Sequence, residues 1–178
     1  MTMDDDELVR SAHQGDAEAF QHLLERHYDT AYRVAYRFTR HMEDAEDIAQ
    51  DICLVLARKI GTFRGGSRFS TWLYRIVINA CRDHVRRQKS TDTLQANYAL
   101  FREQAMADAA HDAARQDWLS EAIAVLEPKL KETAILVLAE DLSHGEAAAA
   151  LGCAESTVSW RMHEVRKALK TLVDEFDD

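Results

Sequence analysis

The first half of the chain carries apolar residues at steps of three and four, the period of a helix with one buried face. Two long stripes, over residues 20–38 and 45–60, predict two amphipathic helices. The acidic stretch over residues 4–13 predicts a shorter helix before them, with Gly15 at its end and Asp16 as the cap of the next helix. The first half of the chain is therefore predicted to be helical from its start.

A loop rich in glycine and polar residues, over residues 63–69, separates these helices from a fourth apolar stripe. Ser70 or Thr71 is placed to cap a fourth helix, whose apolar side continues to Val85. Four helices with short connections predict a compact all-α domain over residues 1–88.

The periodicity weakens over residues 89–112, which hold few branched apolar side chains. Connections of that length are uncommon inside a domain, so this segment is interpreted as a linker. Apolar steps resume at Trp118, and Pro128 suits the first turn of a further helix. A second small helical domain is therefore predicted over residues 113–178.

The last part of the chain predicts a helix-turn-helix. Ser143 and Glu146 have the spacing of a capping box, a helix of small residues follows, and Gly152 ends it. A second helix is predicted from Glu155 to about Val173, with apolar residues on one side and hydroxyls, a tryptophan and arginines on the other. The N-terminal part of such a helix can enter a major groove and contact bases and phosphates. An ordinary helical hairpin is the alternative.

Composition excludes several classes of fold and location. The 178 residues include 1 Pro and 6 Gly, too few turn residues for an all-β sandwich or barrel. No run approaches the roughly 18 apolar residues of a membrane span, and the acidic N-terminus lacks the apolar core of a secretory signal. The 3 cysteines are odd in number and widely spaced, which favours reduced thiols and a cytoplasmic protein.

Patterns that carry catalysis are missing from the sequence. No combination of nucleophile, base and acid is visible, and Gly65 and Gly66 lack the lysine that follows in a phosphate-binding loop. Cys81 and His84 lie one helical turn apart, but two ligands do not make a closed zinc site. The sequence therefore predicts neither an enzyme nor a cofactor or metal site.

Charge is distributed unevenly along the chain. The 22 Lys and Arg against 31 Asp and Glu give a net charge of −9, which by itself argues against a nucleic-acid partner. Residues 64–89, however, hold seven basic side chains and one acidic side chain. Attraction to phosphate depends on charges within about 10 Å and not on the total. This basic segment therefore predicts a local site for a polyanion, the alternative being a solvated helix face.

Three segments of the chain resemble, in the same order, parts of the extracytoplasmic function (ECF) sigma factors, which are small two-domain bacterial initiation factors. The promoter-reading segment of that family resembles residues 63–87, FRGGSRFSTWLYRIVINACRDHVRR. Its core-polymerase-binding helix resembles residues 44–63, and its second DNA-reading domain resembles residues 142–169. The resemblance covers essentially the whole chain, and the first motif is highly specific.

The resemblance implies that the chain is the specificity subunit of RNA polymerase and not an enzyme. In the family, the loop that matches residues 64–69 captures a base flipped out of the nontemplate strand of the −10 element, and Asn79 matches an asparagine of the base pocket. A flipped base needs a ring or apolar wall and polar contacts to its edge. The residues that the resemblance assigns to the −10 element are Arg64, Ser67, Arg68, Phe69, Trp72, Tyr74, Arg75, Asn79, Arg82, Arg86 and Arg87.

The other two segments imply two further interfaces. One would dock on the clamp helices of the largest polymerase subunit, and the helix-turn-helix would read the −35 element. The residues assigned to core-polymerase binding are Asp47, Gln50, Asp51 and Leu54. The residues assigned to the −35 element are Ser156, Thr157, Ser159, Trp160, Arg161, His163, Glu164 and Arg166.

Three positions depart from the family pattern and leave the −35 sequence open. Many members carry a basic residue at the positions of Ser159 and Glu164, and Trp160 is larger than the usual serine. The family implies the core enzyme, promoter DNA and an anti-sigma factor as partners. Two alternatives remain, a sigma mimic that only sequesters an anti-sigma factor and a dimeric helix-turn-helix repressor or activator. Because the chain is acidic overall, we expect it to bind promoter DNA poorly alone and well with the core enzyme.

Overall fold

The computed structural model describes residues 3–92, 119 and 121–176, and in that part of the chain every regular element is helical. The N-terminal half contains α1 (Asp5–His13), α2 (Ala17–Thr39), α3 (Met42–Lys59), the 3-10 turn η1 (Ile60–Thr62) and α4 (Phe69–Asp92). The C-terminal half contains α6 (Pro128–Ala134), the π-helical segment η4 (Ile135–Ala139), α7 (His144–Leu151) and α8 (Glu155–Phe176). The predicted all-α class is confirmed, and none of these helices is long and apolar enough to cross a membrane.

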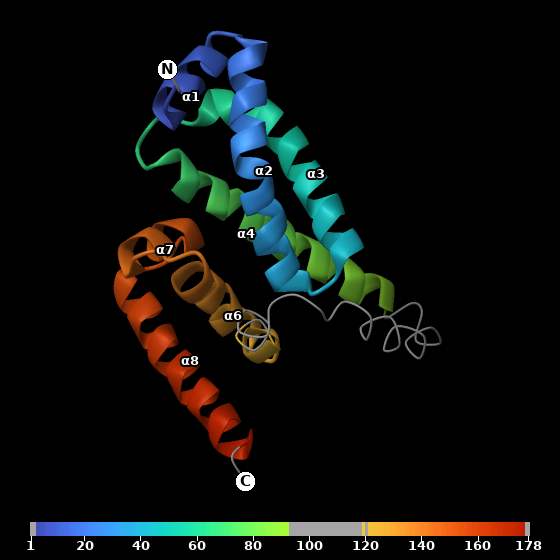
Figure 1. The fold of residues 1–178 in the computed structure, drawn as a ribbon, viewed down its shortest axis with the longest axis vertical. Helices are drawn as coiled ribbons and strands as arrows, with labels where there is room; N and C mark the ends of the chain where they lie inside the picture. Colours follow the sequence, from blue (N-terminus) through green and yellow to red (C-terminus); the bar gives the residue numbers. More distant parts are fainter. Residues whose placement is uncertain (1–2, 93–118, 120, 177–178) are drawn as a thin grey trace.

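α2, α3 and α4 pack into a bundle, and α1 lies against α2 and η1 at one end of it (Figure 1). The apolar stripes of the sequence meet in the core of this bundle. Leu23, Val34, Ile48, Ile52 and Leu73 are each at most 2% exposed. Burial of a side chain of this size contributes about 1.5–3 kcal/mol relative to exposure, so these stripes set the orientation of each helix.

Local capping residues set the first two helix starts. Asp4 forms a capping box with Glu7 at the start of α1, and the predicted cap Asp16 accepts backbone N–H bonds from Glu18 and Ala19 at the start of α2. Each cap satisfies N–H groups that have no partner within the helix.

The fourth helix differs from the prediction at both ends. It begins at Phe69, so Ser70 and Thr71 lie in its first turn, and the Trp72 N–H donates to the Arg68 carbonyl at 3.3 Å. Phe69, the first residue of the helix, is buried. At its other end α4 runs to Asp92, so the predicted domain boundary at residue 88 falls inside a helix. Trp118 and most of the predicted linker lie outside the described residues.

The predicted helix-turn-helix is confirmed in α7 and α8. Ser143 Oγ accepts the Glu146 N–H at 3.2 Å, and Glu146 accepts the Ser143 N–H at 3.0 Å, which completes the capping box. Gly152 ends α7 with φ +68°, a left-handed conformation that favours glycine. In the part of α8 whose side chains are described, Val158, Met162 and Val165 are fully buried on the inner side.

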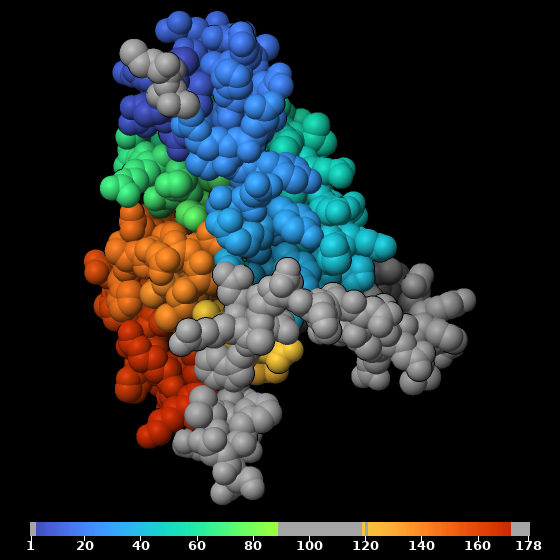
Figure 2. All heavy atoms as spheres, viewed as in Figure 1, coloured from blue at the N-terminus to red at the C-terminus, as the bar shows by residue number. Residues whose placement is uncertain are grey.

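The two halves of the molecule pack against each other. α7 contacts α4, and η4 approaches α2. Figure 2 shows the atoms of α7, in orange, directly against those of α4, in green. The buried side of α7 includes Ala147, Ala148 and Ala150, whose small side chains permit this close approach. The C-terminal half therefore lies over the face of α4 that is predicted to bind DNA.

Candidate nucleic-acid interface

The loop before α4 is fixed at both ends by aromatic rings. Phe63 and Phe69 are 6% and 2% exposed, with ring centroids 5.8 Å apart in an edge-to-face arrangement. Trp72 lies 5.2 Å from Phe63 and 5.7 Å from Phe69, and His27 lies 5.1 Å from Phe69. Aromatic pairs of this geometry stabilise their surroundings beyond simple burial. Phe69 therefore anchors the loop from within, and its direct contact with a base stays a prediction.

The polar residues of the same loop face solvent. Arg64, Ser67 and Arg68 are exposed, and Gly65 adopts φ +70° between them. The loop thus presents two guanidinium groups and a hydroxyl above the aromatic cluster. These groups can contact a phosphate and the edge of an unstacked base.

The first turns of α4 continue this surface. Arg75, Asn79 and Arg82 follow one another at steps of four and three, so they share one side of the helix. Asn79 Oδ1 accepts a hydrogen bond from Arg82 Nη1 at 3.1 Å, and the Asn79 side chain is exposed. Arg86 extends the row by one turn and pairs with Asp83. Arg87 is exposed as well.

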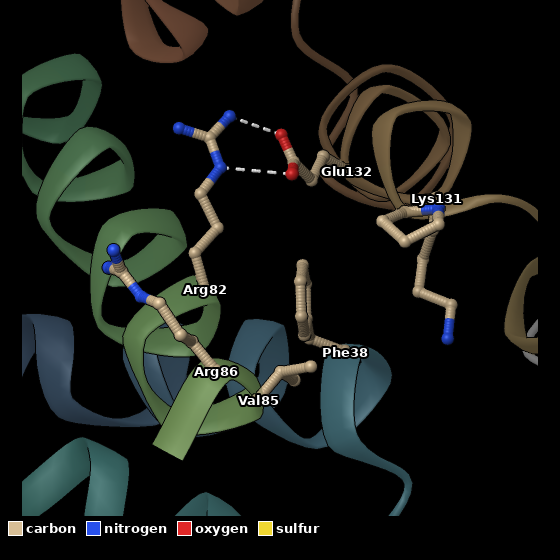
Figure 3. A pocket seen from close by; sticks show the side chains of 7 residues that line it. Phe38, Arg82, Val85, Arg86, Lys131 and Glu132 are labelled. Atoms are coloured by element: carbon tan, nitrogen blue, oxygen red, sulfur yellow. Dashed lines mark hydrogen bonds and ion pairs between the residues drawn. The ribbon is translucent and has the colours of Figure 1, made fainter. Parts of the chain in front are cut away.

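Acceptors from the C-terminal half reach three arginines of this surface. Arg82 Nε donates to Glu132 at 2.9 Å, and a second nitrogen of the same guanidinium completes a two-pronged ion pair (Figure 3). The hydrogen bond to Glu132 raises the pKa of Arg82. Arg75 donates to the carbonyl oxygen of Ala149 in α7. A third contact joins Arg68 to Glu146 at 3.4 Å.

Glu140 makes a second set of contacts between the halves. Its side chain is 2% exposed. Arg33 donates to it at 2.7 and 2.9 Å, Arg37 forms a further ion pair, and the Tyr74 hydroxyl donates to it at 3.0 Å. Burial and the adjacent Glu140 carboxylate raise the pKa of Tyr74 well above its ordinary value. Tyr74, which the resemblance assigns to the −10 element, is 9% exposed and engaged in this cluster.

Sequence reasoning missed Glu132, Glu140, Arg33 and Arg37 as parts of the site. One signal was available, because Arg33 and Arg37 are four residues apart beside the apolar stripe of α2 and so form a paired cationic surface. Nothing local indicates which acid they meet, since Glu140 is 107 residues beyond Arg33.

A groove of about 540 Å³ opens beside the Arg82–Glu132 pair. Figure 3 shows Phe38 and Val85 between α4 and α6, with Arg86 and Lys131 at its sides. Burial and the neighbouring Arg40 guanidinium lower the pKa of Lys131. The groove is thus apolar at its base and rich in cations around it.

The N-terminal half of α8 presents a second polar face. Ser156, Ser159, Trp160 and His163 are exposed, with 61% of Trp160 accessible to solvent. The hydroxyl of Ser159 contacts His144 Nδ1 at 2.9 Å. Arg166 is exposed further along the helix. The half-buried residues of the predicted set are Thr157, Arg161 and Glu164.

α3 presents a third face on the opposite side from its buried Ile48 and Ile52. All four residues predicted to bind core polymerase are exposed there, namely Asp47, Gln50, Asp51 and Leu54. Leu54 is 59% exposed, and Met42, which sequence reasoning did not single out, is 55% exposed at the start of the helix.

The cysteines and acidic groups of the described residues do not form a metal site. No cluster of three or more His, Cys, Asp or Glu able to hold a metal occurs among them. Cys53, Cys81 and Cys153 are free thiols. Burial raises the pKa of Cys81 to about 12, and His84 contacts Asp44 at 3.3 Å.

Comparison with known proteins gives matches along nearly the whole chain. The Sigma-70 region 2 family matches residues 23–91, and the Sigma-70 region 4 family matches residues 116–169. The ECF RNA polymerase sigma factor SigM of Mycobacterium tuberculosis is 34% identical over 171 residues, covering 95% of this chain and 84% of SigM. The ECF RNA polymerase sigma factor SigW of Bacillus subtilis is 30% identical over 173 residues, covering 91% of this chain and 92% of SigW.

Two solved structures are similar in fold. CnrH in complex with the cytosolic domain of CnrY has a TM-score of 0.71 and 25% identity, covering 94% of this chain and 96% of CnrH. The sigma factor RpoE in complex with the anti-sigma factor NepR from Bartonella quintana has a TM-score of 0.70 and 26% identity. The match covers 89% of this chain and 98% of the RpoE chain.

Proposed function

The chain belongs to the extracytoplasmic function (ECF) sigma factors, and we propose that it recognises promoters through the three surfaces described above. Members of this family are RNA polymerase initiation factors. In the proposed arrangement, the loop and α4 read the −10 element and the start of α8 reads the −35 element. The outer face of α3 docks on the clamp helices of the largest polymerase subunit.

The observation that carries the −10 assignment is the row of Arg75, Asn79 and Arg82 on α4, directly after the glycine loop. A guanidinium group matches the geometry of a phosphate, and an amide can donate to and accept from the edge of a base. A base flipped from the opened strand would lie beside Asn79, while the arginines hold the phosphates on either side of it.

The −35 assignment is supported by the exposed start of α8. A helix-turn-helix places the N-terminal residues of its second helix against base edges in the major groove. Trp160 would offer an apolar surface to a thymine methyl group, and Ser156, Ser159 and His163 would offer hydrogen bonds. Many members of the family carry a basic residue at the position of Glu164, whereas the Glu164 carboxylate accepts hydrogen bonds. The preferred −35 sequence of this chain would therefore differ from theirs.

The core-binding assignment is supported by Leu54, an exposed apolar side chain with Asp47, Gln50 and Asp51 beside it. Protein interfaces commonly join an apolar centre to a polar rim. This surface lies on α3, away from the loop and α4 residues assigned to DNA.

An anti-sigma factor would hold this chain inactive in the cytoplasm. The proposal is supported by the two similar structures, since RpoE was solved with an anti-sigma factor and CnrH with the cytosolic domain of CnrY. The intact Asn79 and basic row on α4 argue against the alternative of a sigma mimic, which has no use for a DNA-binding surface.

Asn79→Ala tests the −10 assignment. The side chain is exposed, so the variant should fold and bind core polymerase normally. Loss of base contacts should reduce promoter melting about tenfold, the effect of one good base contact. Permanganate reactivity of unpaired thymines and transcript yield with reconstituted polymerase on a promoter library would measure this.

The matched control is Gln21→Ala, which removes an exposed amide on α2 that is hydrogen-bonded to Glu25 at 2.8 Å. It should melt promoters like the unaltered chain. Loss of core binding in Asn79→Ala, or melting equal to that of the control, would reject the role assigned to Asn79.

A further inference from the structure

We propose that the free chain occludes part of its own −10 surface, because oxygen atoms of its C-terminal half contact three of the arginines that would hold promoter phosphates. The inference rests on the proposed function for the role of these arginines. Promoter binding then requires the two halves to separate.

Acceptors of the C-terminal half contact three arginines of the −10 surface. Arg68 contacts Glu146, Arg82 forms its two-pronged ion pair with Glu132, and Arg75 donates to a backbone carbonyl of α7. Carboxylate and carbonyl oxygens are the acceptors that most resemble phosphate oxygens in a hydrogen bond to guanidinium. The C-terminal half is thus an internal competitor for the same donors.

These contacts exist only while the two halves are packed together. Glu132 and Glu140 are buried, with side chains 5% and 2% exposed, and both carboxylates accept hydrogen bonds from side chains of the N-terminal half. A buried carboxylate needs such partners to offset its loss of water. Separation of the halves would return both carboxylates and their arginines to solvent.

The ion pairs between the halves add little net stability to the packed state. The attraction within a buried ion pair is largely offset by the cost of removing its charges from water. Charged contacts of this kind can therefore be replaced by a competitor that offers other anions and more contacts. DNA phosphates held against the polymerase would be such a competitor.

The α3 face assigned to core polymerase and the start of α8 assigned to the −35 element stay accessible in the packed state. Leu54 on α3 and Trp160 on α8 are 59% and 61% exposed. The closed chain can therefore meet core polymerase before it opens, and the contacts between the halves engage Arg68, Arg75 and Arg82 among the arginines assigned to the −10 element.

The test is the double variant Glu132→Gln and Glu140→Gln in the full chain. Amides keep the shape of both side chains but remove the charges that hold the arginines. The variant should bind a fluorescent pool of mixed-sequence single-stranded DNA about tenfold more tightly without polymerase, as expected when a minor open form becomes the main one. The radius of gyration from small-angle X-ray scattering should increase in the same sample.

The control is Glu18→Gln with Glu25→Gln, which removes two charges from exposed positions on α2. It corrects for the general effect of a less acidic chain on DNA binding. If the test variant and this control have equal DNA affinity and equal radius, self-occlusion is wrong.

A milder variant covers the case in which the double variant does not fold. Glu146→Gln acts at an exposed contact with Arg68 and keeps the acceptor that the capping box needs. It should give a smaller gain in DNA affinity, and no gain over a Glu25→Gln control would contradict the inference. If neither the double variant nor Glu146→Gln gains DNA affinity but core-dependent transcription is unchanged, self-occlusion is wrong and the proposed function stands.

Discussion

Phe69 links the core of the molecule to its DNA-binding loop. The ring is 2% exposed and contacts Phe63, Trp72 and His27, while the neighbouring Arg68 is exposed and contacts Glu146. One residue thus fixes the position at which the exposed part of the loop begins.

Phe69→Ala should destabilise the chain by about 3–5 kcal/mol, the usual cost of emptying a buried aromatic site. Urea unfolding followed by circular dichroism would measure the change. Trp160→Ala is the matched control, because its ring is 61% exposed and its removal should change the free energy of unfolding by no more than about 0.5 kcal/mol. Equal effects of the two changes would show that Phe69 is not part of the core.

The burial of Phe69 could be anticipated in part. Phe69 and Trp72 are three residues apart, which places them on one side of a helix, and Trp72 falls on the apolar stripe that continues to Val85. The sequence alone could not decide for Phe69, because a ring beside a glycine loop can pack inward or stack on a base with equal chemical justification.

At the scale of the element, the turn between α7 and α8 determines where the recognition helix points. Gly152 has φ +68° and is followed within three residues by the start of α8. A side chain at this position fits the surrounding space, since a Cβ there would meet nothing within 4 Å, but it would be strained by the backbone.

Gly152→Ala should therefore lower the free energy of unfolding by about 1 kcal/mol, the cost of a left-handed conformation for a residue with a side chain. Thermal unfolding would detect it. Gly61→Ala is the control, because that glycine also has free space around its Cβ but no positive φ. A loss of stability at Gly61 as large as that at Gly152 would mean that conformation is not the cause.

Helix ends of this kind were predictable because their signals are local. Asp16, Ser143 and Gly152 act on groups within four residues, so their roles follow from spacing alone. The start of α4 was less predictable, because the helix begins at the buried Phe69 and not after the predicted caps Ser70 or Thr71.

At the scale of the whole molecule, the packing of the two halves could not be predicted from the pattern of residues. Arg33 and Glu140 are separated by 107 positions, and Arg82 and Glu132 by 50. Each residue alone fits an exposed charged surface. Only the fold brings these charges together, and it also explains how an acidic chain can cover its own basic segment.

The same packing gives a test that separates this sigma factor from a dimeric helix-turn-helix regulator. A gel shift on promoter DNA should show weak binding by the free chain and strong binding once core polymerase is added, because each DNA surface alone is small and the enzyme holds both on one scaffold. A regulator of the other class would shift duplex DNA fully without polymerase. That outcome would reject the proposed function.

The α4 arginines that pair with the C-terminal half also bear on how the protein moves through the cell. A chromosome offers about 10⁶–10⁹ nonspecific sites to any protein with an open cationic surface. A free chain whose Arg75 and Arg82 are occupied from within escapes most of that competition. Its unbound molecules would diffuse as a pool in search of polymerase and not of DNA, so the concentration of available core enzyme would set how many promoters it can serve.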